Sequence, residues 1–374
     1  MNPENDVTEI VAHSAEADPV EALRDALGDI LAGLIAAGCG PHHLREMVWE
    51  SDRSEAFHLS RHTVELAYRE VFAGFRPPIR LLPGAKPGLT IRARHVAAQP
   101  LPDMLVEGYT LREFGRQYSP RLQADMKALF RQWSRDGAAF RARHGGVDLA
   151  YGPGRFETLD LYRPAGAERT PVFVFIHGGY WQASDKVQHA QFAQSLLDAG
   201  YAVAMPNYGL APDAPLETSI AQSVAALNFL VDEADALGLD AARLHVSGHS
   251  AGAHLAAMAL CASDAPPIAS ALLLSGLYDL KPLGHLPLGR LLGLDDAARA
   301  ARLSPLSQPQ PQSTRIVFAV GEGESDAFKA QSAALATAWR APAPLICSGH
   351  HFGMLEGLNG GALLDLALRT AEGP

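Results

Sequence analysis

Short apolar runs recur along the second part of the chain, and longer amphipathic segments separate them. The run P-V-F-V-F-I at residues 171–176 is apolar at nearly every position, which is typical of a strand buried on both faces of a parallel sheet. Strands that alternate with helices predict a mainly parallel sheet with helices on both faces, an α/β fold. Strands are predicted over residues 157–164, 171–176, 201–206, 242–247, 268–275, 315–320 and 344–347, helices over 124–143, 188–199, 220–236, 253–260 and 328–339, and a partly helical cap over 282–306.

The first part of the chain has a different pattern. Residues 1–18 are polar and acidic, and we expect them to form a disordered tail. Residues 19–38 carry apolar residues at intervals of three and four, which predicts an amphipathic helix. A strand over 44–50, a helix over 60–72 and strands over 79–82 and 89–96 follow, so that residues 19–98 are expected to form a small α+β unit, 99–106 a linker and 107–374 the second domain.

Composition limits the partners that this chain can have. Its formal net charge is -10 at pH 7, which argues against nucleic acid and anionic membranes. The first residues lack the basic and apolar regions of a signal peptide, and no apolar run is long enough to span a membrane. The scattered residues Cys39, Cys261 and Cys347 favour a reducing compartment, with neither a disulfide framework nor a metal site. We therefore expect a cytoplasmic protein that acts on a small-molecule substrate.

The strongest chemical signal is the sequence G-H-S-A-G at residues 248–252. It lies between an apolar run and a helical run of small residues, which gives a strand, a sharp turn and a helix in succession. The pattern G-x-S-x-G in this setting is the nucleophile elbow of α/β-hydrolases. The turn places the Ser250 hydroxyl near a helix N-terminus, where N–H groups and the helix dipole favour developing negative charge. Ser250 is therefore the candidate nucleophile.

A second motif, H-G-G-Y-W, follows the buried run at residues 171–176. Glycines let the backbone approach a substrate closely, and an H-G-G loop supplies oxyanion-hole N–H groups in α/β-hydrolases. We assign the oxyanion hole to the backbone N–H groups of Gly178, Gly179 and Ala251. Candidate residues of the substrate pocket are Tyr180 and Trp181, whose alternative role is to pack beneath the loop, and His249.

A serine hydroxyl is a weak nucleophile and needs a base, which in turn needs an orienting acid. In α/β-hydrolases these groups occur in the order nucleophile, acid, histidine. The base should follow the last predicted strand, which leaves His350 or His351. The acid should follow an earlier strand, and the candidates are Glu322, Glu324 and Asp326 after one strand and Asp279, which could instead fix its own loop, after the strand before it.

Residues 107–374 resemble the kynurenine formamidase (arylformamidase) family of α/β-hydrolases. The motifs that carry this resemblance are H-G-G-Y-W at 177–181, G-H-S-A-G-A-H-L at 248–255 and S-G-L-Y-D-L at 275–280, with shorter matches at 118–121, 151–153, 159–161 and 303–306. The family's acid precedes a Phe by a few residues, which implies Glu324 before Phe328, with Asp326 as a substitute. The family's histidine directly precedes a Phe, which implies His351.

The resemblance also implies a reaction. A serine hydrolase of this family would cleave the formamide of N-formylkynurenine, an aryl formamide, to kynurenine and formate. The step would be acyl transfer through Ser250, with no metal and no cofactor. A carboxylesterase of the same fold, which acts on small or aryl esters with the same groups, stays open as an alternative.

Residues 19–98 resemble the C-terminal half of the reactive-intermediate-deaminase (Rid, YjgF-like) family. The resemblance lies in the helix that ends at Gly38 and in the stretches 44–49, 67–72 and 89–94. The N-terminal strands of that family are missing, and the arginine of its Pro-Ala-Arg-Ser motif falls on Ile79. We therefore expect no imine deamination here and interpret the unit as a binding or homo-oligomerisation module. The alternative function, of a different class, is that of a protein that acts through this binding or oligomerisation module and has little or no catalytic activity.

Overall fold

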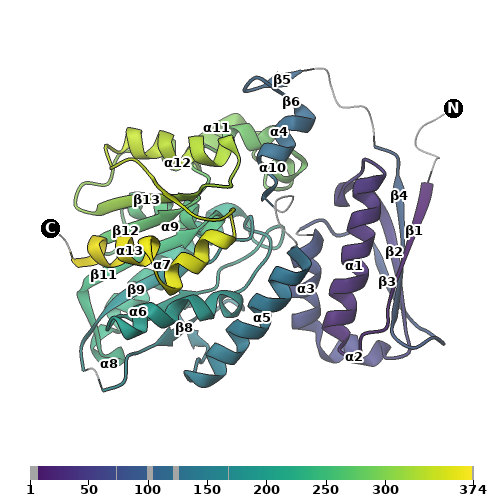
Figure 1. The fold of residues 1–374 in the computed structure, drawn as a ribbon, viewed down its shortest axis with the longest axis horizontal. Coiled ribbons are helices and arrows are strands. Elements are labelled where there is room, and N and C mark those ends of the chain that lie inside the picture. The colour runs from purple at the N-terminus through teal and green to yellow at the C-terminus, as the bar shows by residue number, and fades with distance from the viewer. Residues whose placement is uncertain (1–6, 73, 99–103, 121–125, 167, 373–374) are drawn as a thin grey trace. The chain divides into compact units, whose positions relative to one another are not determined.

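The computed structural model describes residues 7–72, 74–98, 104–120, 126–166 and 168–372. The chain divides into two compact units, of which one comprises residues 1–102 with 182–184 and the other residues 103–181 with 185–374. Each unit has its own sheet and its own apolar core (Figure 1). In the described ranges no helix combines the length and the apolar character needed to cross a membrane.

The first unit contains a four-stranded sheet in the order β1-β4-β2-β3. Helices α1 and α3 lie on one face of it (Figure 1). The apolar residues of α1 at intervals of three and four are buried. Asp18 caps α1, because its carboxylate accepts hydrogen bonds from the N–H groups of Val20 and Glu21. The predicted elements of this unit are confirmed as α1 (Pro19–Ala36), β2 (Leu44–Ser51), α3 (Arg61–Phe72), β3 (Ile79–Pro83) and β4 (Leu89–Val96), with α2 (Ser54–Leu59) in addition.

The prediction of a disordered tail over residues 1–18 is wrong for Val7–Ser14, which form strand β1. This strand pairs antiparallel with β4 along its whole length and lies at the edge of the sheet. Most of its side chains are exposed, so it is held by backbone hydrogen bonds more than by apolar burial. A sequence of this polarity therefore resembles a tail. Residues 1–6 lie outside the described part of the chain.

The second unit is built on an eight-stranded sheet in the order β14-β13-β12-β11-β9-β10-β8-β7. The strands from β14 to β10 are parallel, whereas β8 and β7 are antiparallel to their neighbours. The strands are β7 (Leu149–Ala150), β8 (Thr158–Tyr162), β9 (Thr170–Ile176), β10 (Ala202–Pro206), β11 (Leu239–His249), β12 (Ser270–Leu274), β13 (Arg315–Gly321) and β14 (Leu345–Cys347).

Helices cover both faces of this sheet (Figure 1). Strand β9 shows why: Val172, Val174 and Ile176 join one apolar cluster, and Phe173 and Phe175 join the other. Successive side chains of a strand point to opposite faces, so an unbroken apolar run needs a cover on each side. The helices are α4 (Leu111–Gln117), α5 (Met126–Arg143), α6 (Gln194–Asp198), α7 (Leu216–Asp232), α8 (Ala234–Leu237), α9 (Ala251–Cys261), α12 (Asp326–Ala338) and α13 (Ala362–Glu372), with α10 (Pro287–Leu291) and α11 (Ala297–Arg302) in the predicted cap.

Two details differ from the predicted elements of this unit. The helix predicted over 188–199 begins as the 3-10 helix Lys186–Ala193 and only then becomes α6. The predicted linker 99–106 lies partly outside the described residues, and Leu105–Val106 form a short strand, β5, that pairs with β6 (Tyr109–Thr110). Arg121 of the 118–121 match also lies outside the described residues.

Candidate active site

The loops that carry the predicted site residues all follow strands of the parallel part of the sheet. The H-G-G loop follows β9, the elbow follows β11, the candidate acids follow β13, and the candidate histidines follow β14. The carboxyl ends of parallel strands meet at one edge of a sheet, which is where α/β enzymes bind their ligands. The topology therefore places these loops at one edge.

Ser250 occupies the sharp turn between β11 and α9, with φ 56° and ψ -118°. A side chain other than Gly rarely adopts this conformation, and such strain is typical of functional residues. A Cβ atom on Gly248 would lie 2.2 Å from the carbonyl oxygen of Gly252, and one on Gly252 would lie 2.0 Å from that of Ile176. The turn thus requires glycine on both sides of the serine.

The H-G-G loop lies directly against this turn. A Cβ atom on Gly178 would lie 3.2 Å from the Ser250 Cβ, and Gly179 has a φ of 115°, which favours glycine. The Tyr208 hydroxyl donates to the carbonyl oxygen of His177 at 2.9 Å and so anchors the start of the loop. Ala251 is the first residue of α9, a position whose N–H has no partner within a helix. The three residues predicted for the oxyanion hole thus lie in the two segments that adjoin Ser250.

Glu324 and His351 are hydrogen-bonded in the interior of the protein. The Glu324 Oε2 lies 2.7 Å from the His351 Nδ1, and both side chains are buried. Its Oε1 accepts from the Gly321 N–H at 2.8 Å and from the Ser275 hydroxyl. Burial alone would raise the pKa of the Glu324 carboxyl, but His351, Ser275 and Gly321 outweigh it, so that pKa is lowered. Glu324 is therefore ionised and orients the imidazole.

The other predicted acids and the other histidine make different contacts. The Asp279 carboxylate accepts from the Lys281 N–H at 3.1 Å, which is the loop-fixing role considered above. The His350 Nδ1 accepts from the N–H groups of Phe352 and Gly353 and so holds its own turn. Asp326 begins α12, in the first turn of that helix. The exposed Glu322 bonds through its N–H to the carbonyl oxygen of Cys347.

Two of the predicted pocket residues support neighbouring loops. The His249 Nε2 donates to the His351 carbonyl oxygen at 2.8 Å, and burial together with His351 holds the His249 pKa well below its usual value. Trp181 is fully buried, and its indole N–H donates to the His254 Nδ1 at 3.1 Å. The alternative role predicted for Trp181, packing beneath the loop, describes this arrangement. The half-buried Tyr180 donates through its hydroxyl to the Tyr118 carbonyl oxygen.

Three further residues make hydrogen bonds at the sheet edge that carries the candidate active site, namely Ser275, Gln331 and His254. The sequence motifs do not assign these residues to the site. Gln331 accepts at its Oε1 from the N–H groups of Tyr278 and Asp279, both at 2.7 Å. The His254 Nε2 donates to the Leu303 carbonyl oxygen, so His254 joins the H-G-G loop to the cap. For Ser275 the signal in the sequence is its position, a small polar residue at the end of a buried apolar run.

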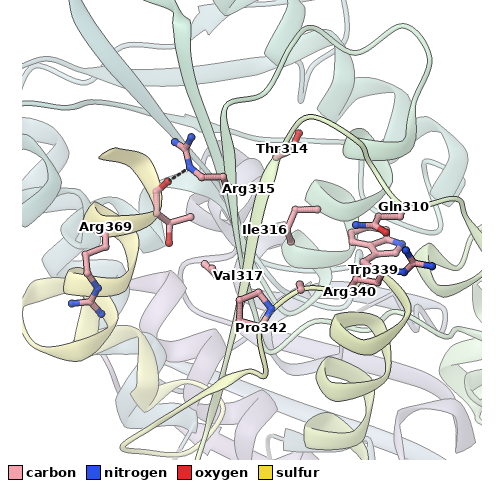
Figure 2. A pocket seen from close by; sticks show the side chains of 11 residues that line it. Gln310, Thr314, Arg315, Ile316, Val317, Trp339, Arg340, Pro342 and Arg369 are labelled. Carbon is pink, nitrogen blue, oxygen red and sulfur yellow. Dashed lines mark hydrogen bonds between the residues drawn. The ribbon is translucent and has the colours of Figure 1, made fainter. Parts of the chain in front are cut away.

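A hollow of about 440 Å³ lies at the amino end of β13, where Arg315 begins the strand. Arg340 and Arg369 extend to opposite sides of it, and the Arg315 guanidinium donates to the carbonyl oxygen of Thr370 (Figure 2). The loops with the predicted site residues follow the carboxyl end of this strand. The hollow therefore does not belong to the candidate active site.

Comparisons with known proteins find relatives of this chain among hydrolases. The BD-FAE family model matches residues 159–271. A kynurenine formamidase of Danio rerio is 31% identical over 230 residues, which are 58% of this chain and 77% of that protein. A structure described as a candidate thioesterase from Silicibacter sp. tm1040 is 29% identical, with 68% of this chain and 98% of that chain covered and a TM-score of 0.63. A carboxylesterase of Mycobacterium tuberculosis is 35% identical over 114 residues, which are 29% of this chain and 36% of that protein.

The match to the Danio rerio protein extends over most of that protein's length. The solved structure shares the fold of the second unit and is covered almost completely. The chain therefore belongs to the kynurenine formamidase family and is a hydrolase of the α/β-hydrolase type.

Proposed function

We propose that this enzyme hydrolyses the formamide of N-formylkynurenine and releases kynurenine and formate. The observation that carries the proposal is the buried pair of Glu324 and His351 at the sheet edge that also holds the strained Ser250. The kynurenine formamidase of Danio rerio supports the choice of a formamide as substrate.

The proposed reaction is acyl transfer in two steps. The His351 Nδ1–H donates a hydrogen bond to the Glu324 carboxylate and keeps its proton, so the unprotonated Nε2 is free to accept the proton of the Ser250 hydroxyl. The Ser250 oxygen attacks the formyl carbon, and the N–H groups of Gly178, Gly179 and Ala251 stabilise the oxyanion. The C–N bond then breaks, and the amine leaves with the proton held by His351. In the second step, water gives a proton to His351 and attacks the formyl ester, and formic acid, which ionises to formate, leaves as the Ser250 oxygen takes that proton back.

The second candidate is a carboxylesterase that uses the same residues. The carboxylesterase of Mycobacterium tuberculosis favours it, although the match covers a smaller part of each chain. An ester has a better leaving group than an amide, so any serine hydrolase of this geometry is expected to show some ester hydrolysis. The presence of esterase activity alone therefore does not decide between the two.

The deciding experiment compares kcat/KM for N-formylkynurenine with kcat/KM for short aryl esters such as p-nitrophenyl acetate. We expect the formamide to be preferred by at least about tenfold, a difference of 1.4 kcal/mol in transition-state stabilisation. A preference of that size for the ester would replace the formamidase assignment by the esterase.

We also propose that residues 7–98 form a Rid-like module for binding or homo-oligomerisation. Its four-stranded sheet with helices on one face supports the proposal. Position 79, where that family has an arginine, is Ile79 on strand β3, so imine deamination is not proposed. Sedimentation of the full chain tests it: a single monomeric species at micromolar concentration would contradict homo-oligomerisation.

A further inference from the structure

Ser275 follows strand β12 at the sheet edge that carries the candidate active site. Its neighbour Leu274 accepts a hydrogen bond from the Ser250 N–H at 2.8 Å. The Ser275 N–H donates to the Ala319 carbonyl oxygen on β13 at 2.9 Å, and β13 leads to Glu324. The backbone at Ser275 thus joins the strand that precedes the nucleophile to the strand that precedes the acid.

The backbone of Ser275 has a conformation that serine rarely adopts. Its φ is 48°, and the residue has no exposed surface. A non-glycine residue in this region is strained, and glycine would avoid that strain. Glycine, which occurs at the next position as Gly276, would adopt the backbone conformation of residue 275 without strain. The chain nevertheless has a serine at position 275.

The hydroxyl of this side chain donates to the Oε1 of Glu324. That oxygen also accepts from the Gly321 N–H, and the opposite oxygen, Oε2, lies 2.7 Å from the His351 Nδ1. The carboxylate is 5% exposed, so it depends on these donors for the solvation that water would otherwise give. The Glu324 Oε1 is the carboxylate oxygen that does not face His351, and the Ser275 hydroxyl is the side-chain donor to it.

We propose that Ser275 is a positioning residue, whose hydroxyl keeps the buried Glu324 carboxylate oriented toward His351 and ionised. This inference rests on the proposed role of Glu324 and His351 in acyl transfer. Without the hydroxyl, the Oε1 retains only the Gly321 N–H, so the last torsion of the Glu324 side chain is less constrained. Hydrogen bonds to charged groups are the stronger ones in proteins, which explains why a strained serine is kept.

The test uses two substitutions at this position, Ser275→Ala and Ser275→Gly. Both remove the hydroxyl, but Ser275→Gly also removes the backbone strain and is expected to keep or raise the Tm. We expect kcat to fall about 10- to 100-fold in both variants with little change in KM, as for the loss of a hydrogen bond to a charged group. The matched control is Ser223→Ala on α7, where a buried hydroxyl donates to the Ser219 carbonyl oxygen of the same helix.

The pH profile separates positioning from packing. Loss of the donor makes the Glu324 carboxylate harder to ionise. The acid limb of the kcat profile is therefore expected to move to higher pH, which a purely structural role would not cause. The control Ser223→Ala should keep the acid limb of the wild type.

The readouts do not depend on one substrate. Each variant is assayed with N-formylkynurenine, with p-nitrophenyl acetate and by the rate at which a fluorophosphonate labels Ser250. A Ser275→Gly variant with wild-type kcat, labelling rate and acid limb would overturn the inference. A wild-type enzyme that hydrolyses the ester but not the formamide would instead overturn the proposed substrate, and the ester and labelling data would still test Ser275.

Discussion

Several buried histidines of the second unit are held uncharged by their surroundings. Burial lowers the pKa of His189 to about 3, and it lowers the pKa values of His245 and His254 to about 4 each. The contacts agree with neutral rings: the His254 Nδ1 accepts from Trp181, and the His245 Nδ1 lies 2.9 Å from the Ser270 hydroxyl. These rings stabilise the fold only while they carry no proton.

We therefore predict that the protein loses stability as the pH falls from 6.5 to 4.5. In this range the unfolded chain, with histidine pKa values near 6.5, binds protons that the folded protein excludes, so the free energy of unfolding decreases. The expected loss is about 2 kcal/mol for each of these histidines, read from urea unfolding at several pH values.

Substitution of one buried histidine checks the cause. His245→Gln should reduce the pH dependence, whereas the same change at the exposed His58 should leave it as in the wild type. A stability that is constant between pH 6.5 and 4.5 would contradict the prediction.

The sequence indicates the residues proposed to react better than it indicates the residues that contact them. Ser250 is predictable because G-x-S-x-G between a strand and a helix has one structural meaning, and the motif resemblance points to Glu324 and His351 among neighbouring candidates. The partners of the His254 and Ser275 side chains come from segments 49 residues away or more. Such contacts depend on how loops meet at the sheet edge, which periodicity does not show.

At the level of elements, the elbow depends on the close approach of α9 to strand β9. A Cβ atom on Gly252 would lie 2.0 Å from the Ile176 carbonyl oxygen and 2.5 Å from that of His177. These are backbone atoms of the last residue of β9 and the first residue of the H-G-G loop, so neither can move without displacing the loop as well. The nucleophile turn and the oxyanion loop are therefore positioned by the same contact.

We predict that Gly252→Ala destabilises the protein by more than about 2 kcal/mol and lowers kcat at least about tenfold. Denaturant unfolding and steady-state kinetics measure the two effects. The matched control is Gly115→Ala in helix α4, where the new Cβ would meet only a Leu286 methyl group at 3.8 Å. This variant should be as stable as the wild type or slightly more stable. Equal stability of the two variants would argue against the close approach.

Elements with a strong apolar pattern are the ones that the sequence predicts well. Strands β9 to β13 are buried on both faces, and their apolar runs define them. Strand β1 was missed because only two of its side chains, Ala12 and Ser14, are buried. The apolar residues of the 3-10 helix Lys186–Ala193 do not recur at a regular helical interval, so the sequence does not distinguish this 3-10 helix from an α-helix.

For the whole molecule, the alternation of strands and helices predicts the α/β class but not the order of the strands. The sheet order depends on the course of the crossovers between parallel strands, which the sequence does not show, and the antiparallel directions of β7 and β8 are likewise not visible in their short runs. The presence of two units is predictable from the change of pattern near residue 100. The resemblance of the second unit to kynurenine formamidases is confirmed by the match to the Danio rerio protein.

The central claim is that the second unit cleaves a formamide by acyl transfer through Ser250. The most direct test is the rate of formate release from N-formylkynurenine by the wild type and by Ser250→Ala. We expect efficient release by the wild type and a loss of kcat/KM on the order of 10⁴-fold or more in the variant, because the remaining groups offer no nucleophile. Formate release by Ser250→Ala within about tenfold of the wild type would contradict the account.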